Sequence, residues 1–181
     1  LFVCCCSIVS VMTKPSNNIV TVGFIALGCP KNLVDSEKML AEIVQSDFVI
    51  SQDISAADVV VINTCGFIAP AKEEALDAIR EAVGYKKTGS VKRVIVTGCL
   101  AQRMGEGLKK EAPGIDAIVG LAERDRIAQI IKSAMSEQGK ETAIYVGGDQ
   151  STVSDNNGRL LITQRNCAYL RISEGCDRKC A

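Results

Sequence analysis

The chain has 181 residues, of which 47% are hydrophobic and 23% are charged, and this composition is typical of a folded globular protein. Because its 21 basic residues are matched by 21 acidic ones, we expect no broad basic face and no direct nucleic-acid binding by this segment. The chain has no histidine, which excludes Ser/His/Asp and Cys/His catalytic sites and mixed cysteine-histidine zinc sites.

The first residues form an apolar stretch, 1–12, that includes three adjacent cysteines at 4–6. The stretch has no basic start and is too short to cross a bilayer, so we do not interpret it as a membrane anchor. Met12 is a plausible start of the functional protein, and we expect residues 1–18 to be a non-functional leader. Adjacent side chains of an extended chain point to opposite sides, so the three cysteines are not predicted to be a ligand set.

From residue 19 onward, apolar runs that predict strands alternate with segments of helical periodicity. The predicted strands are 19–27, 48–50, 59–62, 94–96, 117–119 and 143–146, and the predicted helices are 33–45, 70–85, 102–111 and 127–139. In the first helix the predicted buried face is Leu33, Leu40, Ile43 and Val44. Strands that are apolar at consecutive positions are typical of a parallel sheet covered on both faces. We therefore expect an α/β fold with an open, mostly parallel sheet and helices on both faces.

A change of composition follows the last of these strands. Residues 147–158 are rich in Gly, Ser, Asp and Asn, which indicates a linker. Residues 159–163 and 168–172 predict two further strands, which would begin a second structural unit.

Cys29, Cys65 and Cys99 each follow one of the predicted strands. In an open α/β sheet, ligands bind beyond the carboxyl ends of the strands, so these thiols are expected to converge on one metal site. The alternative is that each is a small buried hydrophobic residue, as free cysteine often is. The regular alternation of helices and strands favours a reduced cytosolic protein over a disulfide framework, although the chain has nine cysteines.

A second pair of cysteines, Cys176 and Cys180, is separated by three residues near the end of the sequence. Such a thiolate pair could bind zinc or an iron-sulfur cluster, and the softness of the sulfur ligands does not choose between them. Cys167 belongs to no motif and is expected to be structural.

Four segments closely resemble the methylthiotransferase family of radical S-adenosylmethionine enzymes, namely residues 26–37, 63–68, 96–100 and 168–176. They occur in the order of the family's motifs. The first two look like the branch that modifies an aspartate of ribosomal protein S twelve. The branch that modifies tRNA typically has a different first motif, with Gln-Met where this chain has Pro30 and Lys31.

The resemblance implies two 4Fe-4S clusters. The first would be held by Cys29, Cys65 and Cys99, and the second, which binds S-adenosylmethionine, by Cys176, Cys180 and a third cysteine expected two residues beyond Ala181. It also implies a methylthiotransferase domain over 19–149, a linker over 150–167 and the truncated start of a radical S-adenosylmethionine barrel over 168–181.

The function implied by the resemblance is the addition of a methylthio group to the β-carbon of an aspartate in ribosomal protein S twelve, free or in the small subunit. The enzyme would be cytoplasmic and would use a reducing electron donor, and this fragment would be inactive alone. No catalytic residue is assigned. Two alternatives stay open: a tRNA adenosine 2-methylthiotransferase, and a non-catalytic metal-binding α/β module that could hold zinc.

Overall fold

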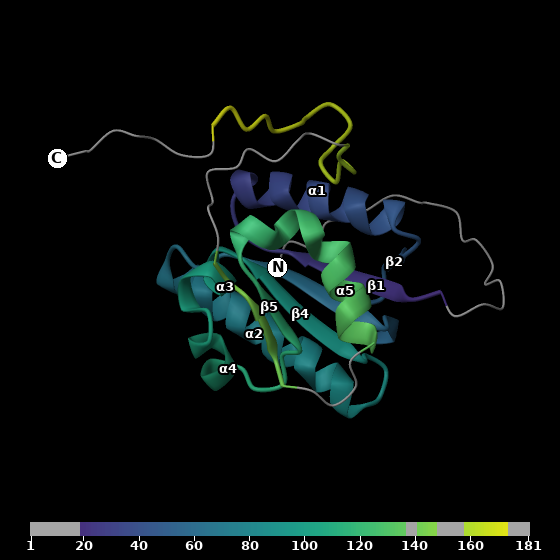
Figure 1. The fold of residues 1–181 in the computed structure, drawn as a ribbon. Helices are drawn as coiled ribbons and strands as arrows, with labels where there is room; N and C mark the ends of the chain where they lie inside the picture. Colours follow the sequence, from purple (N-terminus) through teal and green to yellow (C-terminus); the bar gives the residue numbers. More distant parts are fainter. Residues whose placement is uncertain (1–18, 137–140, 148–157, 174–181) are drawn as a thin grey trace.

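The computed structural model describes residues 19–136, 141–147 and 158–173 (Figure 1). Its elements are, in chain order, β1 (Thr21–Ala26), α1 (Pro30–Gln45), β2 (Val49–Ser51), the 3-10 turn η1 (Ile54–Ala56), β3 (Val59–Thr64), α2 (Ala69–Lys87), β4 (Arg93–Gly98), α3 (Cys99–Met104), α4 (Gly107–Glu111), β5 (Ala117–Val119), the 3-10 turn η2 (Leu121–Arg126), α5 (Ile127–Ser136) and β6 (Ala143–Tyr145). The expected leader, Cys176 and Cys180, and the predicted helix end at Gly139 lie outside the described residues.

The six strands form one sheet in the order β2-β1-β3-β4-β5-β6, and every neighbouring pair is parallel. This confirms the predicted α/β class. The strand order reverses between β1 and β3, because the chain first moves outward to β2 and then returns to the other side of β1. In doubly wound sheets, a crevice for ligands opens at the carboxyl ends of the strands on either side of such a reversal.

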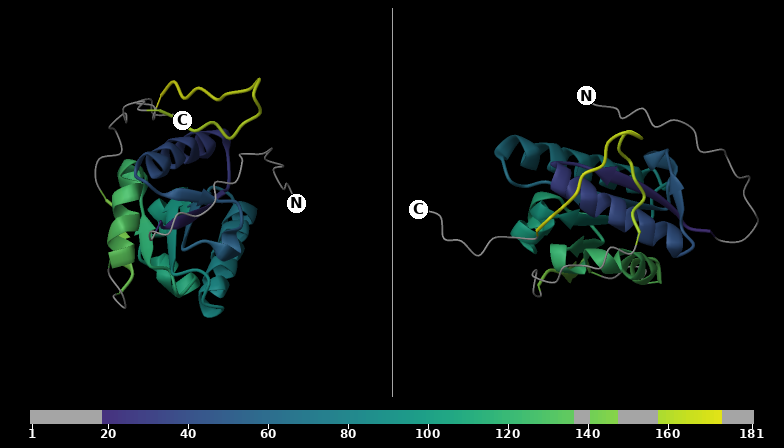
Figure 2. Two further views of the ribbon diagram at one scale, coloured as in Figure 1. Left: turned by 90° about the vertical axis from the view of Figure 1, so that its right-hand side faces the viewer. Right: turned by 90° about the horizontal axis from the view of Figure 1, so that it is seen from above.

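Helices cover both faces of the sheet (Figure 2). Helices α1 and α5 pack on one face, against Val59 and Val61, whereas α2, α3 and α4 pack on the other, against Val60 and Ile62. All six residues of β3 are buried, which explains why consecutive positions of this strand are apolar. Among the described residues, no helix is both long enough and apolar enough to span a membrane.

Helix α1 begins three residues earlier than predicted, at Pro30, whose ring presets the backbone angle of a first helical residue. The prediction that Val44 is buried is wrong, since 49% of this residue is exposed. It is turned by about 100° around the helix from the buried Ile43, and this turn carries it away from the sheet.

The predicted helix 102–111 is two short helices, so this prediction is corrected. Helix α3 begins at Cys99 and ends at Met104, and α4 begins at Gly107. Between them Gly105 has a φ of 49°, in the left-handed region that ends helices, and its N–H donates to the carbonyl of Ala101.

Residues 158–173, called the crossing segment below, contain neither of the two predicted strands. The segment passes over α1 on the side away from the sheet (Figures 1 and 2). The N–H of Leu160 donates to the carbonyl of Glu37, and the N–H of Ile162 donates to the Glu37 carboxylate. A strand needs a neighbouring strand edge, and the crossing segment lies instead on a helix whose own backbone groups are largely paired.

Candidate metal centre

The structure places Cys29, Cys65 and Cys99, called the rim cysteines below, at one edge of the sheet. Cys29 is the residue before the first turn of α1, Cys65 directly follows β3, and Cys99 directly follows β4. The three strands that lead to them, β1, β3 and β4, are adjacent in the sheet. The pairing of Thr64 with Gly98 puts Cys65 and Cys99 at equivalent positions just beyond the paired strands.

At Gly28, the residue before Cys29, the backbone lies very close to Cys65. A Cβ atom on Gly28 would lie 2.7 Å from the Cβ of Cys65 and 3.4 Å from its Sγ. Gly28 also has a φ of 103°, which side chains disfavour. The residue before Cys29 therefore lies against Cys65, at the reversal of strand order between β1 and β3.

The rim cysteines can be reached from solvent. Cys29 is exposed, and Cys65 and Cys99 are each partly buried. Burial raises the pKa of the Cys99 thiol, and the neighbouring Cys65, Cys29 and Asp35 raise this pKa further, while Lys31 opposes them. Negative charge on the Cys99 sulfur is therefore unfavourable, and a bound thiophilic cation would offset this cost.

The chemistry of the donor set fits a group bound by thiolates. Three cysteines from three separate elements lie at one rim, and three protein ligands would leave a fourth position open on a metal or a cubic cluster. In the part of the chain that the structure describes, no group of three Cys, Asp or Glu side chains is already close enough to hold a metal ion. The rim cysteines therefore share a location without being drawn into a coordinating arrangement.

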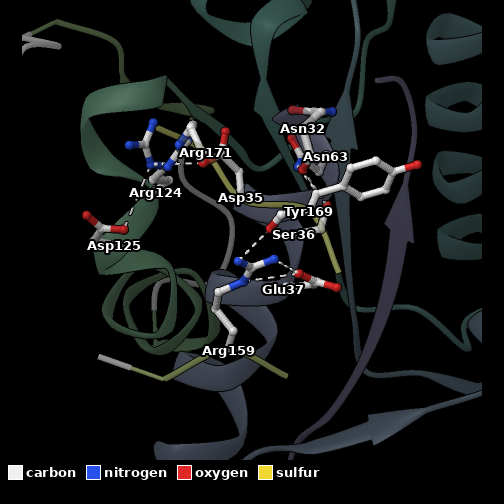
Figure 3. A network of polar contacts seen from close by, with 10 residues as sticks. All are labelled: Asn32, Asp35, Ser36, Glu37, Asn63, Arg124, Asp125, Arg159, Tyr169 and Arg171. Carbon is white, nitrogen blue, oxygen red and sulfur yellow. Dashed lines mark hydrogen bonds and ion pairs between the residues drawn. The ribbon is translucent and has the colours of Figure 1, made fainter. Parts of the chain in front are cut away.

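Two buried asparagines, which lie side by side in Figure 3, stand close to the rim cysteines in the sequence, three residues after Cys29 and two residues before Cys65. Asn32, in the first turn of α1, is 2% exposed, and Asn63, near the end of β3, is fully buried. The Nδ2 of Asn63 donates to the carbonyl of Asn32 at 3.0 Å and to Oγ of Ser36 at 2.8 Å. Asn32 and Asn63 were not among the predicted site residues. A signal that could have found Asn63 is a polar residue in the buried strand β3, directly after its apolar run and two positions before Cys65.

Two acidic residues of α1, Asp35 and Glu37, hold the crossing segment (Figure 3). The Glu37 side chain is 1% exposed and accepts hydrogen bonds from Nε and Nη2 of Arg159. Asp35 accepts a hydrogen bond from Nη1 of Arg171 at 2.6 Å and forms an ion pair with Arg124. These carboxylates were not singled out from the sequence either, because acidic residues in a helix are usually exposed.

The crossing segment runs along α1 toward the helix end that carries Cys29. Its first residue, Gly158, lies near Gln45 at the carboxyl end of α1, whereas Arg171 reaches Asp35, in the second turn of the helix. The side chain of Cys167, within the crossing segment, is exposed. The expectation that Cys167 has a structural role therefore finds no support in core packing.

Comparisons with known proteins find similarity over most of the chain. The model of a family described as Uncharacterized protein family UPF0004 matches residues 21–120. The chain is 47% identical over 163 residues to a protein of Acetivibrio thermocellus named ribosomal protein uS12 methylthiotransferase RimO, a match that covers 88% of this chain and 36% of that protein.

Proteins with the same name in two other bacteria are also similar to the chain. The one from Desulforamulus reducens is 42% identical over 161 residues, which are 89% of this chain and 36% of that protein. The one from Clostridium tetani is 43% identical over 158 residues, which are 87% of this chain and 34% of that protein. The chain thus spans about a third of the length of the curated relatives it matches.

Proposed function

The chain belongs to the UPF0004 family, and on this premise we propose that it is the iron-sulfur part of a RimO-type methylthiotransferase. The substrate of the whole enzyme would be an aspartate of ribosomal protein uS12, which receives a methylthio group on its β-carbon. The observation that supports this proposal best is the location of three cysteines at one rim of the sheet, in a chain 47% identical to a protein of that name.

In this proposal the rim cysteines hold one 4Fe-4S cluster, and Cys176 and Cys180 contribute to a second. When bound, the first would supply an iron open to a sulfur species and the second a reductant for S-adenosylmethionine. Residues 19–149 would form the methylthiotransferase domain, with a linker over 150–167 and the start of the radical domain over 168–181. The enzyme would work in the cytoplasm, where thiols stay reduced, with an electron donor as a further partner.

The residues around the rim would hold the group on one side and leave the other open. Partly buried Cys65 and Cys99 approach it from the sheet, and exposed Cys29 approaches it from the amino end of α1, which favours anionic groups. The exposed side chains of Phe67 and Ile68, two and three residues after Cys65, present an apolar border on which another part of the enzyme could close and exclude water.

The first test uses a variant of the chain in which only the rim cysteines remain and the other six, Cys4, Cys5, Cys6, Cys167, Cys176 and Cys180, are changed to serine. After anaerobic reconstitution with iron and sulfide, we expect about four iron and four acid-labile sulfide per chain. Changing any rim cysteine to alanine should abolish most of this binding. Zinc without labile sulfide, or equal iron in all variants, would contradict the proposal and favour a non-catalytic metal-binding module.

The second test concerns the substrate. The full-length enzyme that contains this chain is reconstituted anaerobically with S-adenosylmethionine and a reductant, and is offered ribosomal protein uS12 and tRNA in separate reactions. Mass spectrometry should find the methylthio group on an aspartate of the ribosomal protein. Modified tRNA beside unmodified ribosomal protein would refute the substrate assignment and favour the tRNA-modifying branch.

A further inference from the structure

A set of buried hydrogen bonds joins the backbone segments that lead into the rim cysteines. The Nδ2 of Asn32 donates to two carbonyls, that of Leu27, two residues before Cys29, and that of Thr64, the residue directly before Cys65. One side-chain amide therefore spans the crevice between β1 and β3. Both of its contacts are made to the backbone, so they constrain where the chain turns toward each thiol.

A second link connects β3 to β4. The hydroxyl of Thr64 donates to the carbonyl of Thr97 at 2.6 Å, and Thr97 lies two residues before Cys99. Thr64 thus takes part in both links, through its carbonyl on one side and its hydroxyl on the other. Together the two side chains join all three segments that carry a rim cysteine.

Asn63 links strand β3 to the first two turns of α1. Its amide nitrogen donates to the carbonyl of Asn32 and to Ser36, so it fixes the first turn of α1 against β3. Its Oδ1 is buried, has no hydrogen-bond partner in the described part of the chain, and lies 2.4 Å from where a Cβ on Gly98 would stand. The buried oxygens of Asn32 and Thr97 also lack a hydrogen-bond partner there. Unpaired buried polar atoms are costly, so these three oxygens do not themselves stabilise the fold.

We propose that Asn32, Asn63 and Thr64 are positioning residues, which hold the three backbone segments so that the rim cysteines can bind one group together. A purely structural role would need only that these residues stabilise the fold. Every direct contact described above is instead made within three residues of a rim cysteine or to the first two turns of the helix that follows Cys29. The inference rests on the proposed function only for the identity of the bound group.

The test measures binding of Cd²⁺, whose thiolate charge-transfer absorption reports how many sulfurs are bonded. It uses the variant that keeps only the rim cysteines. Asn32→Asp and Asn63→Asp preserve side-chain size but replace an amide donor by an acceptor that faces the oxygens to which the amide donated. We expect each to weaken Cd²⁺ binding by about 10- to 100-fold, as the loss of residues that orient metal ligands commonly does.

Two variants of Thr64 distinguish a positioning role from a general effect on the stability of the fold. Thr64→Ser keeps the hydroxyl and should bind Cd²⁺ like the parent, whereas Thr64→Val loses the donor and should bind more weakly or through fewer sulfurs. If the asparagine variants do not fold, this pair still decides the question. The control for general destabilisation is Asp58→Asn, which weakens a partly buried interaction at the opposite end of β3 and should leave Cd²⁺ affinity unchanged.

The proposal is overturned if Asn32→Asp, Asn63→Asp and Thr64→Val bind Cd²⁺ with the parent affinity and absorption, or if Asp58→Asn weakens binding as much as they do. The same parent protein is tested for iron and labile sulfide. A parent that binds Cd²⁺ through its thiols but forms no iron-sulfur cluster contradicts the proposed function, while the variants still decide the positioning role.

Discussion

At the scale of single residues, Gly98 shows how closely the strands approach at the rim. Its φ of 97° is disfavoured for side chains, and a Cβ there would lie 2.4 Å from both Oδ1 of Asn63 and the carbonyl oxygen of Thr64. The residue before Cys99 is therefore in contact with the residues before Cys65. Only glycine permits this approach without moving one of the strands.

We expect Gly98→Ala to lower the free energy of unfolding by about 2 kcal/mol or more, because it adds backbone strain to a steric clash. The matched control is Gly84→Ala within α2, where an added Cβ meets nothing within 4 Å. This control should raise stability by about 0.5–1 kcal/mol. Urea unfolding followed by circular dichroism measures the free energy of unfolding of both variants. Equal stability of the two variants would show that the backbone at Gly98 relaxes without cost.

At the scale of the elements, Asp58 joins three strands at the amino end of the sheet. Its carboxylate accepts hydrogen bonds from the N–H and hydroxyl of Thr21, each at 2.8 Å, and pairs with Lys92 at 2.8 Å. Burial acts to raise the pKa of Asp58, but the hydrogen bonds from Lys92 and Thr21 outweigh it and hold this pKa below its ordinary value of 3.8. The folded state therefore favours the carboxylate.

A carboxylate with a lowered pKa stabilises the fold above its ordinary pKa, and this contribution is lost as the pH falls through the lowered value. We expect Asp58→Asn to reduce stability by about 1–2 kcal/mol at pH 7. The difference from the parent should shrink as the pH falls from about 5 through 3.8 and below. Urea unfolding of both proteins at several pH values measures this difference in stability. A difference that stays constant to low pH would mean that ionisation of Asp58 does not contribute.

The alternation of elements was predictable because it depends on local patterns. The valines of 59–61 indicated a doubly covered strand, and the cysteines after three such strands indicated a shared rim. The contacts that organise the site were not predictable from periodicity. Asn63 donates to Asn32 across 31 positions of sequence, and Arg159 reaches Glu37 across 122. A local pattern carries no information about such partners, and so the buried polar face of α1 was missed.

The two predicted strands of the crossing segment were wrong for a related reason. Apolar residues such as Leu160, Leu161 and Ile162 match a strand, but whether they form one depends on a neighbouring strand edge. Here the chain meets the buried carboxylate of Glu37 instead, and its backbone is held by that single residue through two hydrogen bonds. The break between α3 and α4 at Gly105 differs, because a local signal for it was present in the sequence. The helical spacing of the apolar residues on both sides led to the prediction of one continuous helix.

At the scale of the whole molecule, the crossing segment is held to the sheet domain by buried charge. The Glu37 side chain is 1% exposed, while that of Arg159 is 20% exposed and also donates to the carbonyl of Tyr169 at 2.9 Å. The two partners of this ion pair therefore differ in their access to solvent. If Glu37 loses its charge, Arg159 can still reach water, but if Arg159 is removed, a carboxylate stays buried without its cation.

We therefore expect an asymmetric response. Arg159→Met should lower the free energy of unfolding by about 3 kcal/mol, because it leaves the Glu37 charge unpaired, whereas Glu37→Gln should cost only about 1–2 kcal/mol. In Arg159→Met, hydrogen exchange at the amides of Leu160 and Ile162 should also accelerate, since both donate to Glu37. The control is Arg80→Met, whose exposed pairing with Asp77 should leave stability and exchange unchanged. Equal losses in the two Glu37–Arg159 variants, or unchanged exchange at these amides, would mean that apolar contacts and not this ion pair hold the segment on α1.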